Sequence, residues 1–270
     1  MSKRMGLVAV AGLVAALLAA APARAVDVWD SGHFADDGSG SLNSLAHGSV
    51  QTHDLDQAGG ANDVDWMVVP TLARHSYEAR LSSANQEYDW GACPDCAQFE
   101  RVSSTGTILT DDVGTVNEGG IESYVRSVRW IAAANVTNEY LRVTGDTTVT
   151  ETASSVYTVS FWDTTYSIPR WNSSGTQTTV IFITNLTQTA ASVTLNFYSG
   201  TGALLSTASF TLQPNALNVL STASIPALAG QSGHLHVTHT AGYGGLSGKA
   251  VALEPSTGFT FDTAMIPIAQ

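Results

Sequence analysis

The chain of 270 residues is acidic, with 23 Asp and Glu against 11 Lys and Arg and a formal net charge of −12. Such a charge repels phosphate backbones and anionic lipid, so we expect no nucleic acid partner. The length allows either one large domain or two of ordinary size.

The first 25 residues have the three parts of an export signal in the expected order. Lys3 and Arg4 precede an apolar run at residues 7–21, and small residues close the segment at 23–25. The run is shorter than the roughly 20 residues of a membrane anchor, and no later stretch is apolar enough to span a bilayer. We therefore expect cleavage after Ala25 and a secreted protein, extracellular or periplasmic, without membrane insertion.

Charge divides the rest of the chain into two parts. Residues 26–167 hold 21 Asp and Glu against six Arg, whereas residues 168–270 hold two acidic and two basic residues. The step lies beside Pro169, which restricts the residue before it to extended conformations. The sequence thus predicts a signal peptide at 1–25 and two domains, at 26–167 and 168–270.

Strand patterns occur in both parts. Apolar and polar side chains alternate at residues 77–81, 157–161 and 193–197, as in half-buried strands. Residues 178–183 resemble a strand buried on both faces of its sheet. Glycines at 200 and 202 predict a hairpin turn. Because no long segment has helical periodicity, we predict an all-β fold of antiparallel sandwiches.

The first domain resembles the bacterial pre-peptidase C-terminal domain over residues 26–163. Five segments carry the resemblance, namely residues 53–56, 62–66, 77–81, 106–112 and 139–143. The family implies a jelly-roll-like β-sandwich attached to secreted hydrolases, and some relatives bind calcium and matrix polymers. An insertion at residues 85–99 departs from the family pattern. The second domain is loosely similar to immunoglobulin-like sandwich modules of bacterial secreted proteins.

Carboxylates cluster in the first domain, and they predict a calcium site. Asp54, Asp56 and Asp65 match positions one, three and twelve of an EF-hand loop, but Ala58 at position five offers no side-chain oxygen. No flanking helices are predicted either, so we expect a calcium site of another geometry. Its predicted ligands are Asp54, Asp56, Asp63 and Asp65, with Asp36 and Asp37 as further candidates. The alternative is that these side chains are solvated turn residues.

Cys93 and Cys96 are the only two cysteines in the chain. In an oxidising compartment a pair this close most often closes a small disulfide loop. A redox pair would need a helix N-terminus after a strand, and structural zinc would need two more ligands. We therefore predict a disulfide between Cys93 and Cys96.

Three histidines suggest a second metal hypothesis. His234 and His236 would share one face of a strand, and His239 follows three residues later, so the three could hold zinc. No carboxylate lies within the next ten residues to orient a ligand, and the alternative is a polar strand face that carries histidine by chance.

Motifs for catalysis are missing from the sequence. Residues 230–233 lack the spacing of a nucleophile elbow, and residues 244–249 lack the first glycine of a phosphate-binding loop. We therefore expect a non-catalytic secreted binding or structural module, stabilised by calcium, that engages an extracellular polymer, a surface or a protein. The alternative is a secreted hydrolase, or its accessory protein, with dispersed catalytic residues. Exposed tryptophans clustered in a flat stripe would indicate contact with a polysaccharide or a protein, whereas buried ones would belong to the core. The tryptophans concerned are Trp90, Trp130, Trp162 and Trp171.

Overall fold

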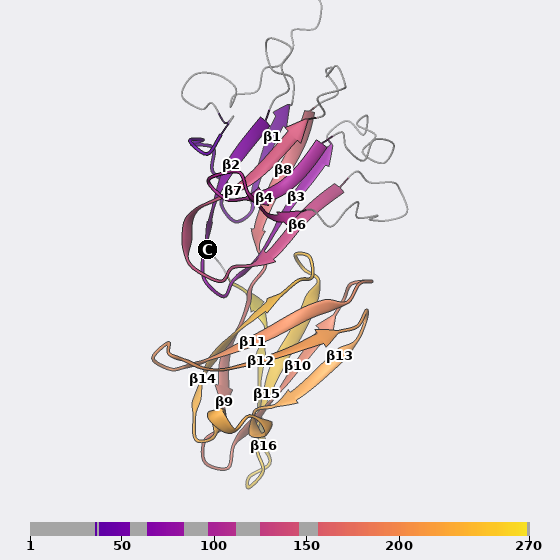
Figure 1. Cartoon of the computed structure of the whole chain (residues 1–270). Helices are drawn as coiled ribbons and strands as arrows, with labels where there is room; N and C mark the ends of the chain where they lie inside the picture. Colours follow the sequence, from indigo (N-terminus) through magenta and orange to yellow (C-terminus); the bar gives the residue numbers. More distant parts are fainter. Residues whose placement is uncertain are drawn as a thin grey trace, which may run out of the picture.

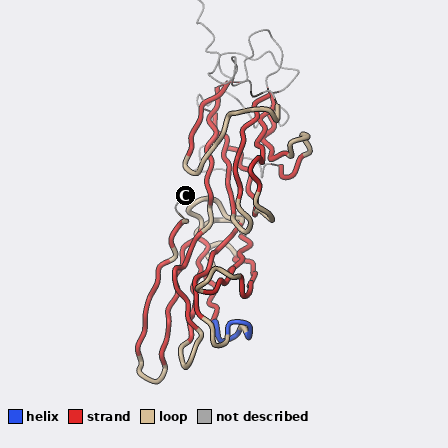
Figure 2. Tube along the Cα trace, turned by 90° about the vertical axis from the view of Figure 1, so that its left-hand side faces the viewer, coloured by secondary structure: helices blue, strands red, loops and turns tan. Residues whose placement is uncertain are grey.

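The computed structural model describes residues 36, 38–54, 64–83, 97–111, 125–145 and 156–268. The predicted export signal and cleavage site lie outside this part of the chain. Strands dominate the described residues, and the helical structure of these residues is confined to two short 3-10 turns, η2 (Thr222–Ser224) and η3 (Pro226–Leu228) (Figure 2). No helix among the described residues is long and apolar enough to cross a membrane. The predicted all-β fold is confirmed.

The first sandwich consists of eight strands in two antiparallel sheets (Figure 1). Its strands are β1 (Ser49–Asp54), β2 (Val64–Thr71), β3 (Ser76–Ser83), β4 (Ala97–Val102), β5 (Ile108–Asp111), β6 (Val125–Ile131), β7 (Val136–Gly145) and β8 (Val156–Asp163). Their order is β1-β8-β3-β6 in one sheet and β2-β7-β4-β5 in the other. The first strand therefore lies beside the last, and successive strands mostly change sheets, which is the jelly-roll arrangement.

Alternation explains the core of the first sandwich. Tyr77, Ala79 and Leu81 of β3 are buried against Tyr157, Val159 and Phe161 of β8, as the sequence pattern predicts. Met67 and Val69 of β2 close the core from the opposite sheet. Because side chains alternate along a strand, the intervening residues of β3 and β8 face outward.

The second sandwich also has two antiparallel sheets, ordered β13-β10-β15-β16 and β12-β11-β14-β9-β17. Its strands are β9 (Tyr166–Asn172), β10 (Thr178–Asn185), β11 (Ala191–Ser199), β12 (Leu204–Leu212), β13 (Leu217–Ser221), β14 (Ser232–His239), β15 (Leu246–Glu254), β16 (Phe259–Ala264) and β17 (Ile266–Pro267). Val193, Leu195 and Phe197 are buried as predicted. The predicted hairpin joins β11 to β12, and Gly202 adopts φ +84° there.

One strand differs from its prediction. The sequence of β10 predicts burial on both faces, but its residues alternate between half-buried and buried. Ile181 and Ile183 point into the core, whereas Val180 and Phe182 lie on the outer face of the sheet. The second sandwich covers only the inner face, so the apolar outer side chains of β10 stay partly in solvent.

The two sandwiches are joined through Thr164 and Thr165, which are both buried. The Thr164 N–H donates to the Ser76 carbonyl of β3 at 2.7 Å, and the Ile268 N–H donates to the Thr165 carbonyl at 3.0 Å. The linking residues are therefore hydrogen-bonded to both sandwiches. β9 begins at Tyr166, so Tyr166 and the following serine, which the sequence assigned to the first domain, lie in a sheet of the second sandwich.

A buried carboxylate adds a second connection at this junction. Glu78 of β3 accepts hydrogen bonds from Arg129 Nε at 2.7 Å and from the Tyr243 backbone N–H at 2.6 Å. Tyr243 lies between β14 and β15, and its ring stacks on Trp162 of β8 with centroids 5.6 Å apart. A loop of the second sandwich is thus bound to the first by a charged hydrogen bond and an aromatic contact.

Histidine burial at this junction makes stability depend on pH. His239 Nε2 lies 2.8 Å from the Thr164 carbonyl and is a donor to it, and burial lowers the pKa of His239 to about 4. The unfolded chain takes up the proton near pH 6.5 and the folded chain only near pH 4. The stability that the folded chain has with His239 neutral is therefore fully present above pH 6.5 and is lost as the pH falls toward 4.

We expect His239 to account for about 2 kcal/mol of the stability lost between pH 8 and pH 5. Burial also lowers the pKa of His236 to about 4, but this half-exposed side chain adds less. Urea unfolding at both pH values should show a smaller loss for His239→Gln than for the unmodified protein. Equal losses in the two proteins would contradict this assignment.

Candidate metal centre

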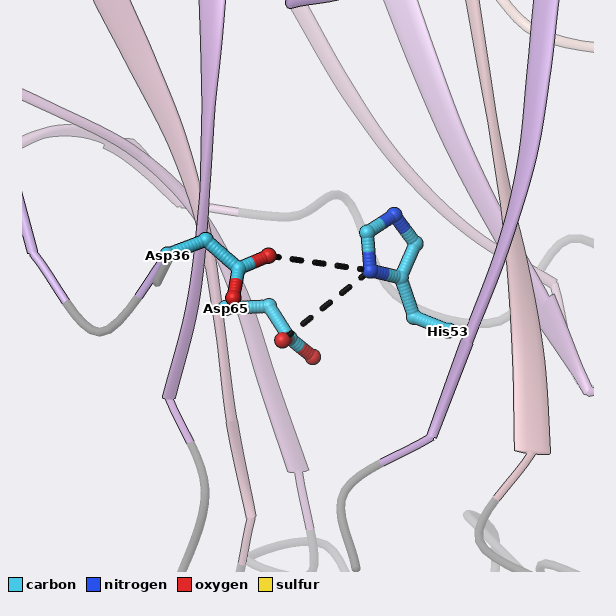
Figure 3. Close-up of side chains that lie close together, drawn as sticks. All are labelled: Asp36, His53 and Asp65. Carbon is cyan, nitrogen blue, oxygen red and sulfur yellow. Dashed lines mark ion pairs between the residues drawn. The ribbon is translucent and has the colours of Figure 1, made fainter. Parts of the chain in front are cut away.

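A cluster of ligand-type side chains lies between the two sheets of the first sandwich. His53 is the second-last residue of β1, and Asp65 is the second residue of β2, in the opposite sheet. The carbonyl of Asp36 accepts a hydrogen bond from the Trp66 N–H at 2.8 Å, which places the N-terminal segment beside β2. Figure 3 shows the imidazole of His53 facing the carboxylates of Asp36 and Asp65.

The geometry of the cluster is compact and closed. His53 Nδ1 lies 3.9 Å from Asp36 Oδ2 and 3.9 Å from Asp65 Oδ1. The side chains of His53 and Asp65 are 0% exposed and that of Asp36 is 1% exposed. Within the described ranges, this is the one group of three or more His, Cys, Asp or Glu whose ligand atoms lie within 4.8 Å of one another.

Neighbouring side chains orient the imidazole of His53. Gln51 Oε1 lies 3.2 Å from His53 Nε2, and a proton on Nε2 satisfies this contact. With Nε2 directed to Gln51, Nδ1 is the ring nitrogen that faces the two carboxylates. The ring of Tyr157 stacks on the imidazole, with centroids 5.5 Å apart and an interplanar angle of 17°. The position of Nδ1 is therefore fixed from two sides.

Both carboxylates also have polar neighbours. The Tyr157 hydroxyl donates to Asp65 Oδ2, and Asn43 Nδ2 donates to Asp36 Oδ2 at 3.4 Å. Asn43 is fully buried, and its Oδ1 accepts no hydrogen bond from the described residues. Two buried carboxylates thus face one imidazole in the interior of the sandwich.

The structure places only part of the predicted calcium site. Of the four predicted ligands, Asp65 belongs to the cluster, and Asp36 joins it from the wider candidate set. Asp54 ends β1, and its side chain is not among those described. Asp56 and Asp63, like the further candidate Asp37 and the predicted disulfide Cys93–Cys96, lie outside the described residues. Calcium bound by the four aspartates therefore stays a prediction.

Sequence reasoning missed His53 as a ligand. A signal was present in the inward positions of β1, where Ser49, Gln51 and His53 are less exposed than Val50 and Thr52. A strand that turns polar side chains inward at the edge of a core marks a polar site. That pattern becomes visible only when it is known which face of β1 points into the core.

The second metal hypothesis does not assemble in the structure. His234 and His236 share a face of β14 as predicted and pack on Tyr198, with centroids 5.2 and 5.0 Å away. His239 lies at an odd offset from them and so points to the other face, where its ring stacks on Tyr166. The three imidazoles therefore do not converge on one point.

Tryptophan side chains form no exposed stripe among the described residues. Trp130 and Trp171 are buried in the two cores, and the ring of Trp162 contacts both Tyr243 and the guanidinium of Arg80. Trp90 lies outside the described residues.

Comparison of the sequence with known protein families and with curated proteins finds no match.

Proposed function

We propose that the chain is a non-catalytic secreted structural module that binds a second copy of itself through the second sandwich. The observation that carries this proposal is an apolar surface on the sheet β13-β10-β15-β16. We call it the outer apolar face, and it comprises Val180 and Phe182 of β10, Leu217 and Val219 of β13, and Val251 and Leu253 of β15. Large contiguous apolar patches on a soluble protein mark interaction sites.

Strand register makes the outer apolar face continuous. Val219 pairs with Phe182 across β13 and β10, and Val180 pairs with Val251 across β10 and β15. Leu217 is 56% exposed and Val219 is 52% exposed. Contact with another sheet would bury both side chains, and each apolar side chain removed from water contributes about 1.5–3 kcal/mol when burial is complete.

The chemistry of this face favours a protein partner over a polysaccharide. Sugar rings stack on exposed, flat aromatic side chains. The outer apolar face is aliphatic except for Phe182, and the described tryptophans lie elsewhere. Two sheets pack well when aliphatic side chains interdigitate between them, as in the interior of a sandwich.

Charge supports a second copy as the occupant. Residues 164–270 carry two basic and two acidic side chains, so two such halves meet without net repulsion. On the outer face itself, Lys249 Nζ lies 2.9 Å from Asp262 Oδ2. In the dimer that we propose, a two-fold axis passes between these residues and brings Lys249 of one copy opposite Asp262 of the other. We therefore expect the surface to be complementary to itself.

Sedimentation of the chain from residue 26 onward tests the proposal. We expect a dimer for the unmodified protein, a monomer for Val219→Lys and a dimer for the control Val50→Lys. Val50 is a suitable control because it is also a strand valine, 65% exposed, on the first sandwich. A monomeric unmodified protein, or equal dissociation by both substitutions, would overturn the proposal.

A further inference from the structure

We propose that Asp36, His53 and Asp65 bind a divalent transition-metal cation of the zinc class, which ties the N-terminal segment to both sheets of the first sandwich. The three ligand atoms come from three separate stretches of chain and converge in the interior. Zinc bound at about 2.0–2.2 Å to four ligands holds them roughly 3.3–3.6 Å apart. The two distances of 3.9 Å from His53 Nδ1 need to shorten only slightly to reach this range.

The nitrogen ligand decides the class of metal. Calcium takes six to eight oxygen ligands, whereas imidazole suits zinc and its neighbours in the first transition row. The cluster offers one imidazole nitrogen and two carboxylates, which is a donor set for zinc. A doubly charged cation also matches the two carboxylates of Asp36 and Asp65 in charge.

Two of the three ligands have the supporting contact that metal sites use. His53 Nε2 contacts Gln51, and Asp65 accepts a hydrogen bond from Tyr157. Partners of this kind fix the orientation of the ligands and raise their basicity. Such contacts distinguish the cluster from a chance gathering of acidic side chains.

Asn43 supplies an independent indication of a ligand. Its Oδ1 is buried and accepts no hydrogen bond from the described residues, and its Nδ2 lies 3.4 Å from Asp36 Oδ2. The oxygen and nitrogen of an amide are interchanged by a simple rotation. After that rotation Oδ1 lies 3.4 Å from Asp36 Oδ2, a separation that suits two adjacent zinc ligands, so Asn43 is the candidate for a fourth ligand. The closed, buried surroundings of such a centre indicate a structural role.

Metal binding by the chain from residue 26 onward, first freed of metal with a chelator, tests this inference. We expect one equivalent of zinc per chain and a higher melting temperature with zinc than with calcium or magnesium at equal ionic strength. His53→Gln should weaken zinc binding by more than roughly 100-fold. His234→Gln, which changes one histidine of the His234–His236 pair on β14, should leave the zinc affinity unchanged.

Cobalt(II) gives a readout that does not depend on a variant folding. Its visible absorption should show four-coordination by nitrogen and oxygen in the unmodified protein, and zinc should displace it. Absence of stoichiometric zinc binding, loss of binding through His234→Gln alone, or stabilisation by calcium but not by zinc would each overturn the inference.

Discussion

Glu78→Ala should lower the free energy of unfolding by about 3 kcal/mol, because it removes the acceptor from a buried ionic cluster. The Glu78 carboxylate is 0% exposed, and it receives Arg129 Nε at 2.7 Å and Arg80 Nε at 3.1 Å. It also accepts the Tyr243 N–H from the second sandwich. The substitution therefore weakens the first sandwich and its junction with the second together.

Urea unfolding followed by tryptophan fluorescence measures this loss. Glu254→Ala is the matched control, because Glu254 also accepts side-chain hydrogen bonds, from Thr176 and Ser256, but at the exposed surface. We expect a much smaller change for the control. Similar losses for the two substitutions would show that Glu78 is not a structural connection.

Trp171→Ala should cost about 3–5 kcal/mol, the range measured when large aromatic side chains are removed from cores. Trp171 is fully buried, its indole Nε1 donates to the His234 carbonyl at 2.9 Å, and its ring meets Phe197 edge-on. The substitution leaves a cavity and removes the donor from a carbonyl of β14. Both effects destabilise the second sandwich.

Two further substitutions separate these effects. Trp171→Phe keeps most of the volume and removes only the donor, so it should cost less than Trp171→Ala. Phe259→Ala removes an aromatic ring that is 66% exposed and should change stability little. An equal cost for Trp171→Ala and Phe259→Ala in urea unfolding would contradict the assigned core.

Strand patterns predict much of the fold, because burial on one face leaves a period of two in the sequence. The alternating residues of β3, β8 and β11 show this directly. The same rule fails for β10, because its apolar outer side chains predict that a second layer of the chain covers them, and none does among the described residues. A sequence records that a face is apolar, but not whether the chain itself or another copy covers it.

The candidate metal centre could be predicted only in part. Carboxylates in the sequence drew attention to Asp65 and, among the further candidates, to Asp36, but His53 joins them only because β1 and β2 lie in opposite sheets of the sandwich. Likewise, the contact between Glu78 and Tyr243 joins residues 165 positions apart. Contacts of this kind depend on strand order, which local periodicity does not encode.

Mixing two charge variants tests self-association most directly. Lys249→Asp and Asp262→Lys each place like charges opposite one another in the two-fold dimer, so each variant alone should sediment as a monomer. In an equimolar mixture the introduced carboxylate of one variant faces the introduced ammonium of the other, and we expect a heterodimer. An effect confined to the pair within one copy gives no such rescue. A mixture that remains monomeric, while the unmodified protein dimerises, would contradict the proposed face.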